Sequence, residues 1–369
     1  MRQILFQIPL DRPWNLGPFG QVPGVGFGLV LLLWSLVGVG TLILRRRQNR
    51  ETWTLSSEFW PGLNWLFVAS LIVFVAPRVG AYLRAQGSPA FQEGLPVFGY
   101  GLMMFIGFSV GTTLATFRAQ REGLSGEVIW DLASWLFIPG IIGARLYYLI
   151  QHGDRVFTGT PTPAWFIDAL NLSQGGLVLY GGLIGGAIGY FTFCYLRRIR
   201  PLALADIIVP SVFIGIGFGR IGCFLNGCCY GAASSLPWAV RFPRDSATFS
   251  AMLEKNLVEI HAACTPPLHP TQIYSSIDGF LIAAITAWYF RYRRRNGEVL
   301  AVALLIYPVT RFLLELLRAD EAGQLKTTLT TAQLVSITLF VINLGFIYYL
   351  SKRPAVREPV TVPPGPVTT

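Results

Sequence analysis

Long apolar runs, each about the length of a membrane-crossing helix, dominate this chain. A helix needs about 20 residues to span the hydrocarbon core of a bilayer. Nine runs meet this condition, at residues 24–44, 61–78, 98–117, 128–150, 176–196, 204–223, 272–290, 298–317 and 330–350. With 53% hydrophobic and 13% charged residues, the chain could not cover a water-soluble surface. We therefore predict an all-α integral membrane protein with nine transmembrane helices, and exclude a cytosolic enzyme and a disordered protein.

The loop arginines and lysines predict the orientation of these helices. One set of short loops, next to alternate span ends, holds Arg45, Arg46, Arg47, Arg50, Arg118, Arg121, Arg197, Arg198, Arg200, Arg291, Arg293, Arg294, Arg295, Lys352, Arg353 and Arg357. Cytoplasmic loops carry such an excess. The N-terminus is thus expected outside and the C-terminus in the cytoplasm. The net charge of +10 follows from this placement and predicts no nucleic-acid partner.

The same pattern divides the chain into three parts. Residues 1–94 are expected to form a surface segment and two additional transmembrane helices, and residues 95–350 the main membrane domain. Within that domain, residues 224–270 form a small extracytoplasmic head between spans six and seven, with a short amphipathic piece near 247–261. Residues 351–369 are rich in proline and are expected to be a disordered cytoplasmic tail.

Three arginines lie inside apolar runs, near the outer end of each: Arg145, Arg220 and Arg311. A buried arginine costs about 2.5–3.5 kcal/mol on insertion scales and cannot lose its charge. Each could snorkel to the headgroups or pair with a carboxylate, for which the candidates are Glu315, Asp131 and Asp278. Glu315 follows Arg311 by four residues and shares its helical face. Together, the three arginines favour a site for a lipid phosphate, which a guanidinium binds in bidentate fashion.

The surroundings of Arg220 and the return from the head add further candidates. The segment GIGFGRIGCFLNGCCYG is rich in glycine, which allows close helix packing and lets backbone N–H groups approach an anion. The segment LHPTQIY places His269, Gln272 and Tyr274 at the membrane entry of the seventh run, where a structural and a functional role are equally supported.

The five cysteines are Cys194, Cys223, Cys228, Cys229 and Cys264. A disulfide involving Cys264, or inert packing, is favoured in an oxidising compartment. A metal site is less favoured because the chain has neither a Cys-x-x-Cys pair nor a neighbouring histidine to supply the usual ligand spacing. A catalytic thiol is the third alternative. We expect no metal and no cofactor.

Six segments, in order, give the chain a resemblance to the bacterial prolipoprotein diacylglyceryl transferase family. They are YGLMMFIGF at 100–108, GARLYYLI at 143–150, GGLVLYGGLIGG at 175–186, GRIGCFLNGCCYG at 219–231, HPTQIY at 269–274 and RFLLELLR at 311–318. The resemblance covers about residues 95–350. It implies a multi-pass protein of the bacterial inner membrane, without a cofactor. The implied reaction moves a diacylglyceryl group from phosphatidylglycerol to the lipobox cysteine of a preprolipoprotein and releases glycerol 1-phosphate.

The resemblance also assigns roles to residues of this chain. Arg220, Arg311 and Tyr180 are implied as catalytic, with Arg220 on the headgroup phosphate and Arg311 held by Glu315. The implied phosphatidylglycerol contacts further include Arg145, Tyr100, Cys223, Gly231, His269 and Gln272. This chain departs from the family at four positions: Tyr180 replaces a usual histidine, Cys223 an asparagine, and Cys228 and Ser275 each a glutamate. Tyrosine has an ordinary pKa near 10, so Tyr180 can orient a substrate but is a poor base at neutral pH.

Two other classes of membrane protein remain as alternatives to a transferase. One is a transporter or flippase for an anionic lipid or solute, in which buried arginines would line a pathway. The absence of a sequence repeat and the similar depth of the three arginines count against it. The other is a thiol-redox protein using Cys223, Cys228 and Cys229, which the missing Cys-x-x-Cys motif disfavours.

Overall fold

A computed structural model describes residues 4–8, 14–15, 21–22, 35–36, 39–40, 95–156, 176–318 and 329–361. The chain divides into two compact units, residues 2–102 and residues 103–369 together with Met1. The two spans predicted at 24–44 and 61–78 lie outside the described residues, except for two short fragments of the first.

The N-terminal unit contains short strands that the all-α prediction did not include. Strand β1 (Ile4–Ile8) pairs antiparallel with β4 (Leu95–Phe98), and β2 (Trp14–Asn15) pairs antiparallel with β3 (Gln21–Val22). Part of the expected surface segment therefore forms short antiparallel strand pairs.

Seven long helices follow, at the positions of the seven remaining apolar runs. They are α4 (Gly99–Arg121), α5 (Glu127–Val156), α7 (Leu179–Leu196), α8 (Pro201–Asn226), α10 (Thr271–Tyr289), α11 (Glu298–Leu316) and α12 (Thr331–Lys352). All except α10 are long and apolar enough to cross a membrane, which makes six candidate spans within the described ranges. The chain is therefore a helical membrane protein, whereas the total of nine spans and the orientation stay predictions.

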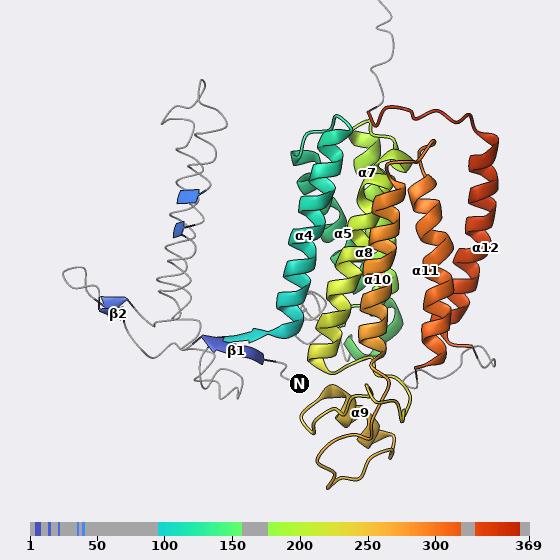
Figure 1. The fold of residues 1–369 in the computed structure, drawn as a ribbon. Helices are drawn as coiled ribbons and strands as arrows, with labels where there is room; N and C mark the ends of the chain where they lie inside the picture. Colours follow the sequence, from blue (N-terminus) through green and yellow to red (C-terminus); the bar gives the residue numbers. More distant parts are fainter. Residues whose placement is uncertain are drawn as a thin grey trace, which may run out of the picture. The chain divides into compact units, whose positions relative to one another are not determined.

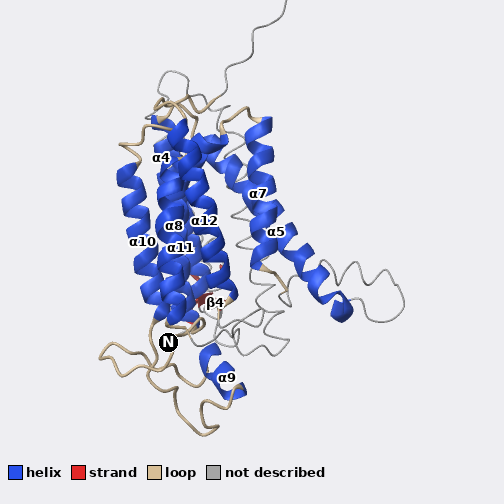
Figure 2. Cartoon of the chain, turned by 90° about the vertical axis from the view of Figure 1, so that its right-hand side faces the viewer, coloured by secondary structure: helices blue, strands red, loops and turns tan. Residues whose placement is uncertain are grey.

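Helix α8 is the central element of the second unit. It packs against α10 and α11, and α12 packs on α11, while α5 and α7 form a separate close pair (Figures 1 and 2). The main apolar core lies around the first half of α8, where Leu204, Ile207 and Phe213 meet Phe193 of α7 and Ile282 of α10. This packing fixes the second half of α8, which carries Arg220.

Glycines allow the α5–α7 pair to pack at backbone distance. A Cβ added to Gly185 would lie 2.1 Å from the carbonyl oxygen of Pro139, and one added to Gly143 would lie 2.4 Å from that of Gly181. Membrane helices use small residues in this way to approach each other closely. The glycines of GGLVLYGGLIGG therefore serve packing.

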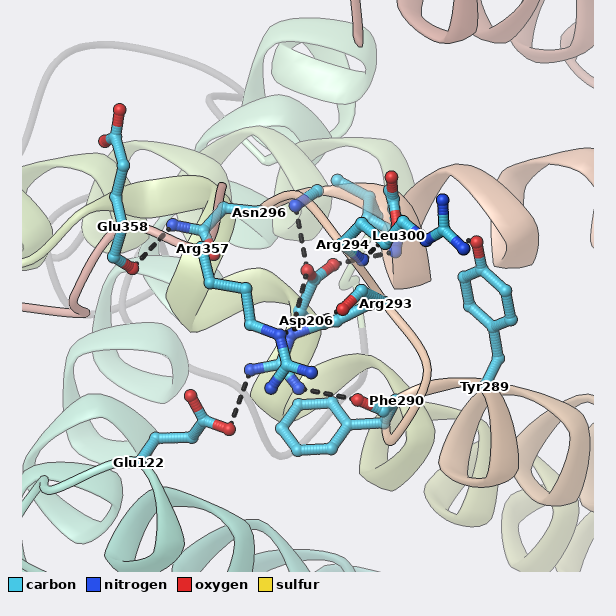
Figure 3. A network of polar contacts seen from close by, with 12 residues as sticks. Glu122, Asp206, Tyr289, Phe290, Arg293, Arg294, Asn296, Leu300, Arg357 and Glu358 are labelled. Atoms are coloured by element: carbon cyan, nitrogen blue, oxygen red, sulfur yellow. Dashed lines mark hydrogen bonds and ion pairs between the residues drawn. The ribbon is translucent and has the colours of Figure 1, made fainter. Parts of the chain in front are cut away.

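A buried network of charges closes the other end of α8 (Figure 3). Asp206 is fully buried and accepts hydrogen bonds from the backbone N–H groups of Gly297 (2.8 Å) and Leu300 (3.0 Å). The guanidinium of Arg293 lies 3.7 Å from the Asp206 carboxylate and 2.8 Å from that of Glu122. Arg293, which the sequence places in a short cytoplasmic loop, lies in the turn after α10 and is 2% exposed, because it pairs with Asp206 of α8 and with Glu122 just after α4.

The beginning of the predicted disordered tail is part of this end of the bundle. The backbone N–H of Arg200 donates to the carbonyl oxygen of Val360 at 2.8 Å, and Nε of Arg357 donates to that of Arg293 at 2.9 Å. Val360 is buried in the main core. The prediction of disorder is thus wrong for residues 353–361, whose polar groups pair with the basic loops. Residues 362–369 lie outside the described residues.

The predicted head folds around its own small core. The short helix α9 (Ala247–Glu254) lies within the predicted amphipathic piece and begins at Ser246, whose Oγ accepts from the N–H of Phe249. Phe242, Met252 and Leu268 are buried together with Tyr230. Helix α8 leads into this head and α10 leads out of it (Figure 1), and Oγ1 of Thr248 in the head donates to the carbonyl oxygen of Gly227, directly after α8.

Candidate functional site

Arg220 is a half-buried cation near the C-terminal end of α8. Its guanidinium makes no hydrogen bond or ion pair with any residue in the described part of the chain. The side chain of every other arginine predicted inside an apolar run has such a contact. A guanidinium in a membrane helix cannot shed its charge, so the Arg220 cation is without a counter-charge among the side chains that the structure describes.

A second group of charges lies at the C-terminal end of α11. The carboxylate of Glu315 is fully buried and pairs with Arg311, as the four-residue spacing predicts. It also lies 3.6 Å from Nη1 of Arg318 and accepts from Oγ1 of Thr330 at 3.2 Å. One buried carboxylate thus holds two arginines. Arg318 was not identified from the sequence, although its position three residues after Glu315 was a signal for this pair.

The loop that follows α8 joins these two groups. The backbones of Gly231 and Arg318 form an isolated antiparallel β-bridge, and the N–H of Ala232 donates to the carbonyl oxygen of Leu317 at 2.8 Å. The positive charges of Arg220 and Arg318 both act on the thiol of Cys229. The end of α8, the loop at 227–232 and the end of α11 therefore form one cationic region.

Side chains from the head and from α10 fix this loop. Gly227, Cys228 and Cys229 each offer a carbonyl oxygen, which accepts from Oγ1 of Thr248 (2.7 Å), Nε2 of Gln272 (2.7 Å) and Oγ1 of Thr271 (3.0 Å), respectively. Gln272 is 1% exposed and lies beneath the loop. Gln272 thus contacts the candidate site through its hydrogen bond to the backbone of this loop.

Gly231 and His269 are in direct contact at the same place. The N–H of Gly231 donates to the carbonyl oxygen of His269 at 3.2 Å, and a Cβ on Gly231 would lie 2.7 Å from that oxygen. Only glycine permits this approach. The His269 ring lies 3.4 Å (Nδ1 to Oη) from Tyr274, which in turn accepts from Nε1 of Trp238 at 2.7 Å. HPTQIY therefore anchors the loop that carries the candidate site.

Three cysteines gather at the end of α8. The sulfur atoms of Cys223, Cys228 and Cys229 lie within 4.8 Å of one another. All five cysteines of the chain are free thiols, so the disulfide considered for Cys264 is not formed. The pKa of Cys229 is lowered from its ordinary value, first by hydrogen bonds with the thiols of Cys223 and Cys228 and then by the charges of Arg220 and Arg318.

The backbone at Cys229 is unusual for a residue with a side chain. Its φ of 60° lies in the left-handed region, two residues after Gly227 at φ 69°. Such a conformation costs about 1–2 kcal/mol for a non-glycine residue and persists only where its surroundings enforce it. The three side-chain hydrogen bonds to this loop supply that constraint.

Arg145 and Tyr180 lie on the α5–α7 pair. Nη1 of Arg145 donates to the carbonyl oxygen of Gly176 at 3.2 Å, and its guanidinium stacks 5.2 Å from the centre of the Tyr148 ring. Tyr180 is in the first turn of α7 and is 38% exposed. Tyr100 is in the first turn of α4 and belongs to the N-terminal unit. Both tyrosines thus come from helix starts.

The other two carboxylates considered as arginine partners lie elsewhere. Asp131 pairs with Arg197 at 2.5 Å, and Asp278 accepts from Oγ1 of Thr310 at 3.0 Å. Among the described residues, Glu315 is therefore the carboxylate that pairs with an arginine of the predicted set.

An apolar groove of 370 Å³ runs between α4, α5 and α8. Its lining includes Gly107 and Gly111 of α4, Leu132 and Leu136 of α5, and Ile208 and Gly215 of α8. Gly215 precedes Arg220 by five residues, about 7.5 Å along the helix axis. The same helix therefore lines an apolar groove and, further along, carries a cation that pairs with no described residue, a combination that suits an amphiphilic anion.

Comparison with known proteins points to one family. The sequence profile of the prolipoprotein diacylglyceryl transferases matches residues 89–349. The chain is similar to the phosphatidylglycerol–prolipoprotein diacylglyceryl transferase of Clostridium tetani, with 36% identity over 259 residues, which is 70% of this chain and 95% of the relative. It is also similar to the proteins of that name from Gloeobacter violaceus (32% over 267 residues, 72% and 93%) and Rhodopirellula baltica (37% over 257 residues, 69% and 49%).

Proposed function

The chain belongs to the prolipoprotein diacylglyceryl transferase family, and we propose that it transfers the diacylglyceryl group of phosphatidylglycerol to the lipobox cysteine of a preprolipoprotein. The acceptor sulfur forms a bond to the glycerol carbon that carries the phosphate ester. The carbon–oxygen bond to the phosphate breaks, and glycerol 1-phosphate leaves with the bonding electrons. The thiol proton is lost, and the product is a thioether.

The single observation that carries this proposal is the guanidinium of Arg220, which has no hydrogen-bond or ion-pair partner among the residues that the structure describes. The reaction moves negative charge onto phosphate oxygens as the ester leaves. A preplaced cation in a site of low dielectric constant stabilises that charge more strongly than water does. Arg220 binds the headgroup phosphate in this mechanism, since its donor fork matches two phosphate oxygens.

Arg311 and Glu315 act beside it. The buried Glu315 carboxylate holds Arg311 in one orientation and also contacts Arg318. A fixed guanidinium needs no reorganisation when charge develops in the transition state. Tyr180 and Arg145, on the α5–α7 pair, orient the substrates. Tyr180 uses its phenol as a hydrogen-bond group.

The apolar groove between α4, α5 and α8 takes an acyl chain of the donor lipid. Its lining is mostly apolar, and the hydroxyl groups of its two polar residues, Thr112 and Ser211, are engaged in hydrogen bonds within the protein. Each buried methylene contributes about 0.8 kcal/mol. A donor with shortened acyl chains should therefore bind more weakly, and the position of the headgroup phosphate should not change.

The site faces the outer side of the bacterial inner membrane in this proposal. Three basic segments lie at helix ends: Arg121 ends α4, Arg200 precedes α8, and Arg295 precedes α11. The head, which contains Lys255, lies between α8 and α10. Reporter fusions after the three arginines should give a cytoplasmic signal, and a fusion at Lys255 an external one. A cytoplasmic signal at Lys255 would reject both this orientation and an external acceptor.

The test of the activity uses purified protein, phosphatidylglycerol and a lipobox peptide. Mass spectrometry should find the diacylglyceryl thioether with the parent protein and none with Arg220→Ala. Arg244→Ala, which removes an exposed arginine of the head, is the matched control and should keep the activity. Movement of phosphatidylglycerol between leaflets without any thioether would instead identify a lipid transporter.

A further inference from the structure

We propose that Cys223, Cys228 and Cys229 form a binding site for one thiophilic metal ion, with Cu(I) as the cation that the three sulfur ligands fit best. This site is separate from the reaction proposed above, which uses a thiol of the substrate. It does not depend on that reaction, because its test measures metal binding alone.

The distances between the sulfur atoms carry the proposal. Sγ of Cys228 lies 3.9 Å from Sγ of Cys229, and all three sulfur atoms lie within 4.8 Å of one another. Three sulfur atoms bound at about 2.3 Å to a common ion in one plane are about 4.0 Å apart. A disulfide would need a sulfur–sulfur distance of about 2.0 Å. The cluster is thus spaced for an ion between the sulfur atoms.

The fold brings the three thiols together by reversing the chain at the end of α8. The N–H of Cys228 donates to the carbonyl oxygen of Cys223 at 3.1 Å, across the left-handed Gly227. This is the hydrogen bond of a helix-ending turn, and it places Cys228 back over Cys223. The left-handed Cys229 then turns its own side chain toward the same point.

The surrounding hydrogen bonds hold this arrangement before any ion binds. Thr248, Gln272 and Thr271 fix the carbonyl oxygens of the three consecutive residues Gly227–Cys229. The strained conformation of Cys229 is therefore imposed by two other elements, α9 and α10. A strained non-glycine residue that aims a ligand atom at two others is an independent sign of a functional cluster.

The chemistry of the donors selects the ion. Thiolates prefer soft cations such as Cu(I) and Zn(II) over hard ones such as Mg²⁺ and Ca²⁺. Zn(II) almost always takes four ligands, and no fourth ligating residue of the described chain joins this cluster. Cu(I) with three thiolates carries two surplus negative charges. The positive charge of Arg318, which acts on Cys229, offsets part of this charge.

Metal titration of the full-length protein tests the site. The reduced protein in detergent is titrated anaerobically with Cu(I), and in a second arm with Zn(II), against a chromophoric chelator. We expect one equivalent of Cu(I) to bind, Zn(II) to compete less well, and binding to be lost in Cys223→Ser, Cys228→Ser and Cys229→Ser. Cys264→Ser and Cys194→Ser are the matched controls and should keep it.

A second measurement on the unmutated chain covers the case in which a variant fails to fold. Bound Cu(I) should slow the alkylation of Cys223, Cys228 and Cys229 and leave that of Cys264 unchanged, as read by peptide mass spectrometry. Equal alkylation rates with and without Cu(I), or full binding by the Cys228→Ser protein, would overturn the proposal. The proposal would also be wrong if two of the three cysteines formed a disulfide and the protein bound no Cu(I) after that disulfide was reduced.

Discussion

Helix α8 carries a buried acid near its beginning and a half-buried arginine near its end, and the protein treats these two charges in opposite ways. Asp206 has two backbone donors and the Arg293 guanidinium around it (Figure 3). Arg220 has no such partner in the described chain. Removing one partner of a buried ion pair destabilises a fold, whereas a charge without a partner in the protein is available to a ligand. The two ends of one helix thus separate the two functions.

The first prediction removes the unsatisfied charge. Arg220→Ala should lower the rate of thioether formation by about a thousandfold, since a preplaced donor to developing charge contributes on that scale. Arg220→Lys should restore little of the activity, because an ammonium group lacks the bidentate fork. The measurement is product formation per folded protein, with thermal unfolding as the second readout. Near-normal turnover of Arg220→Ala would remove the distinction between the two ends.

The second prediction removes the satisfied charge. Asp206→Ala leaves Arg293 without its buried partner and two backbone N–H groups unpaired, and should destabilise the protein by about 3–5 kcal/mol. The remaining folded protein should keep its rate of thioether formation. Denaturant unfolding in detergent measures the first effect and the transfer assay the second.

Asp131→Ala is the control for this prediction. Asp131 pairs with Arg197 on the surface, where both side chains are about half exposed, so its loss should cost less than about 1 kcal/mol. Equal destabilisation by the two variants would show that burial of the pair does not matter.

The sequence predicted one end of the bundle better than the other. The Arg311–Glu315 pair follows from a four-residue spacing within one helix. Asp206 lies in α8, whereas Glu122 and Arg293 lie in the turns after α4 and α10, far apart in the chain. Helical periodicity carries no information on which of these residues meet. From the sequence alone, Arg293 and Arg118 therefore fall among the residues of the cytoplasmic loops. Arg118 instead donates to the carbonyl oxygen of Ile207 at 2.8 Å.

The helices themselves were predictable because hydrophobicity and length decide them in a bilayer. The tail and the cysteines were not. The hydrogen bond from the Arg200 N–H to Val360 joins two residues that are far apart in the sequence, with α8, α10, α11 and α12 between them. Cys228 and Cys229 reach Cys223 only through the left-handed turn at Gly227. The Asn-Gly sequence at 226–227 was the one local signal for that turn.

The third prediction tests an arginine that is satisfied and yet belongs to the active end. Glu315→Gln keeps the shape of the side chain but weakens its hold on Arg311 and Arg318. The transfer rate should fall by about tenfold, as for the loss of one charge-assisted hydrogen bond. The loss should be smaller than in Arg311→Ala. Kinetics with varied phosphatidylglycerol should place the effect on kcat, and a change confined to KM would contradict an orienting role.

The last prediction concerns the cysteines beside Arg220. The nucleophile belongs to the substrate peptide, so Cys228→Ser and Cys229→Ser should keep a substantial part of the rate. Cys223 lies three residues after Arg220, nearly on its helical face, and its thiol donates only a weak hydrogen bond. Cys223→Asn should therefore keep the rate or raise it by less than about tenfold, the contribution of one ordinary hydrogen bond, because the amide is the stronger donor. Cys223→Leu should lower the rate more by filling the space beside the guanidinium.

Thioether formation at saturating phosphatidylglycerol, normalised to folded protein, compares these variants. The size of the effect at position 223 tells how much of the anion site is built by neighbours of Arg220 and how much by Arg220 alone. Complete loss of activity in a correctly folded Cys228→Ser or Cys229→Ser protein would mean that a thiol of this chain takes part in the reaction. The active end would then depend on its cysteines as well as on its unpaired cation, since a covalent or redox step would need a sulfur atom held at that place.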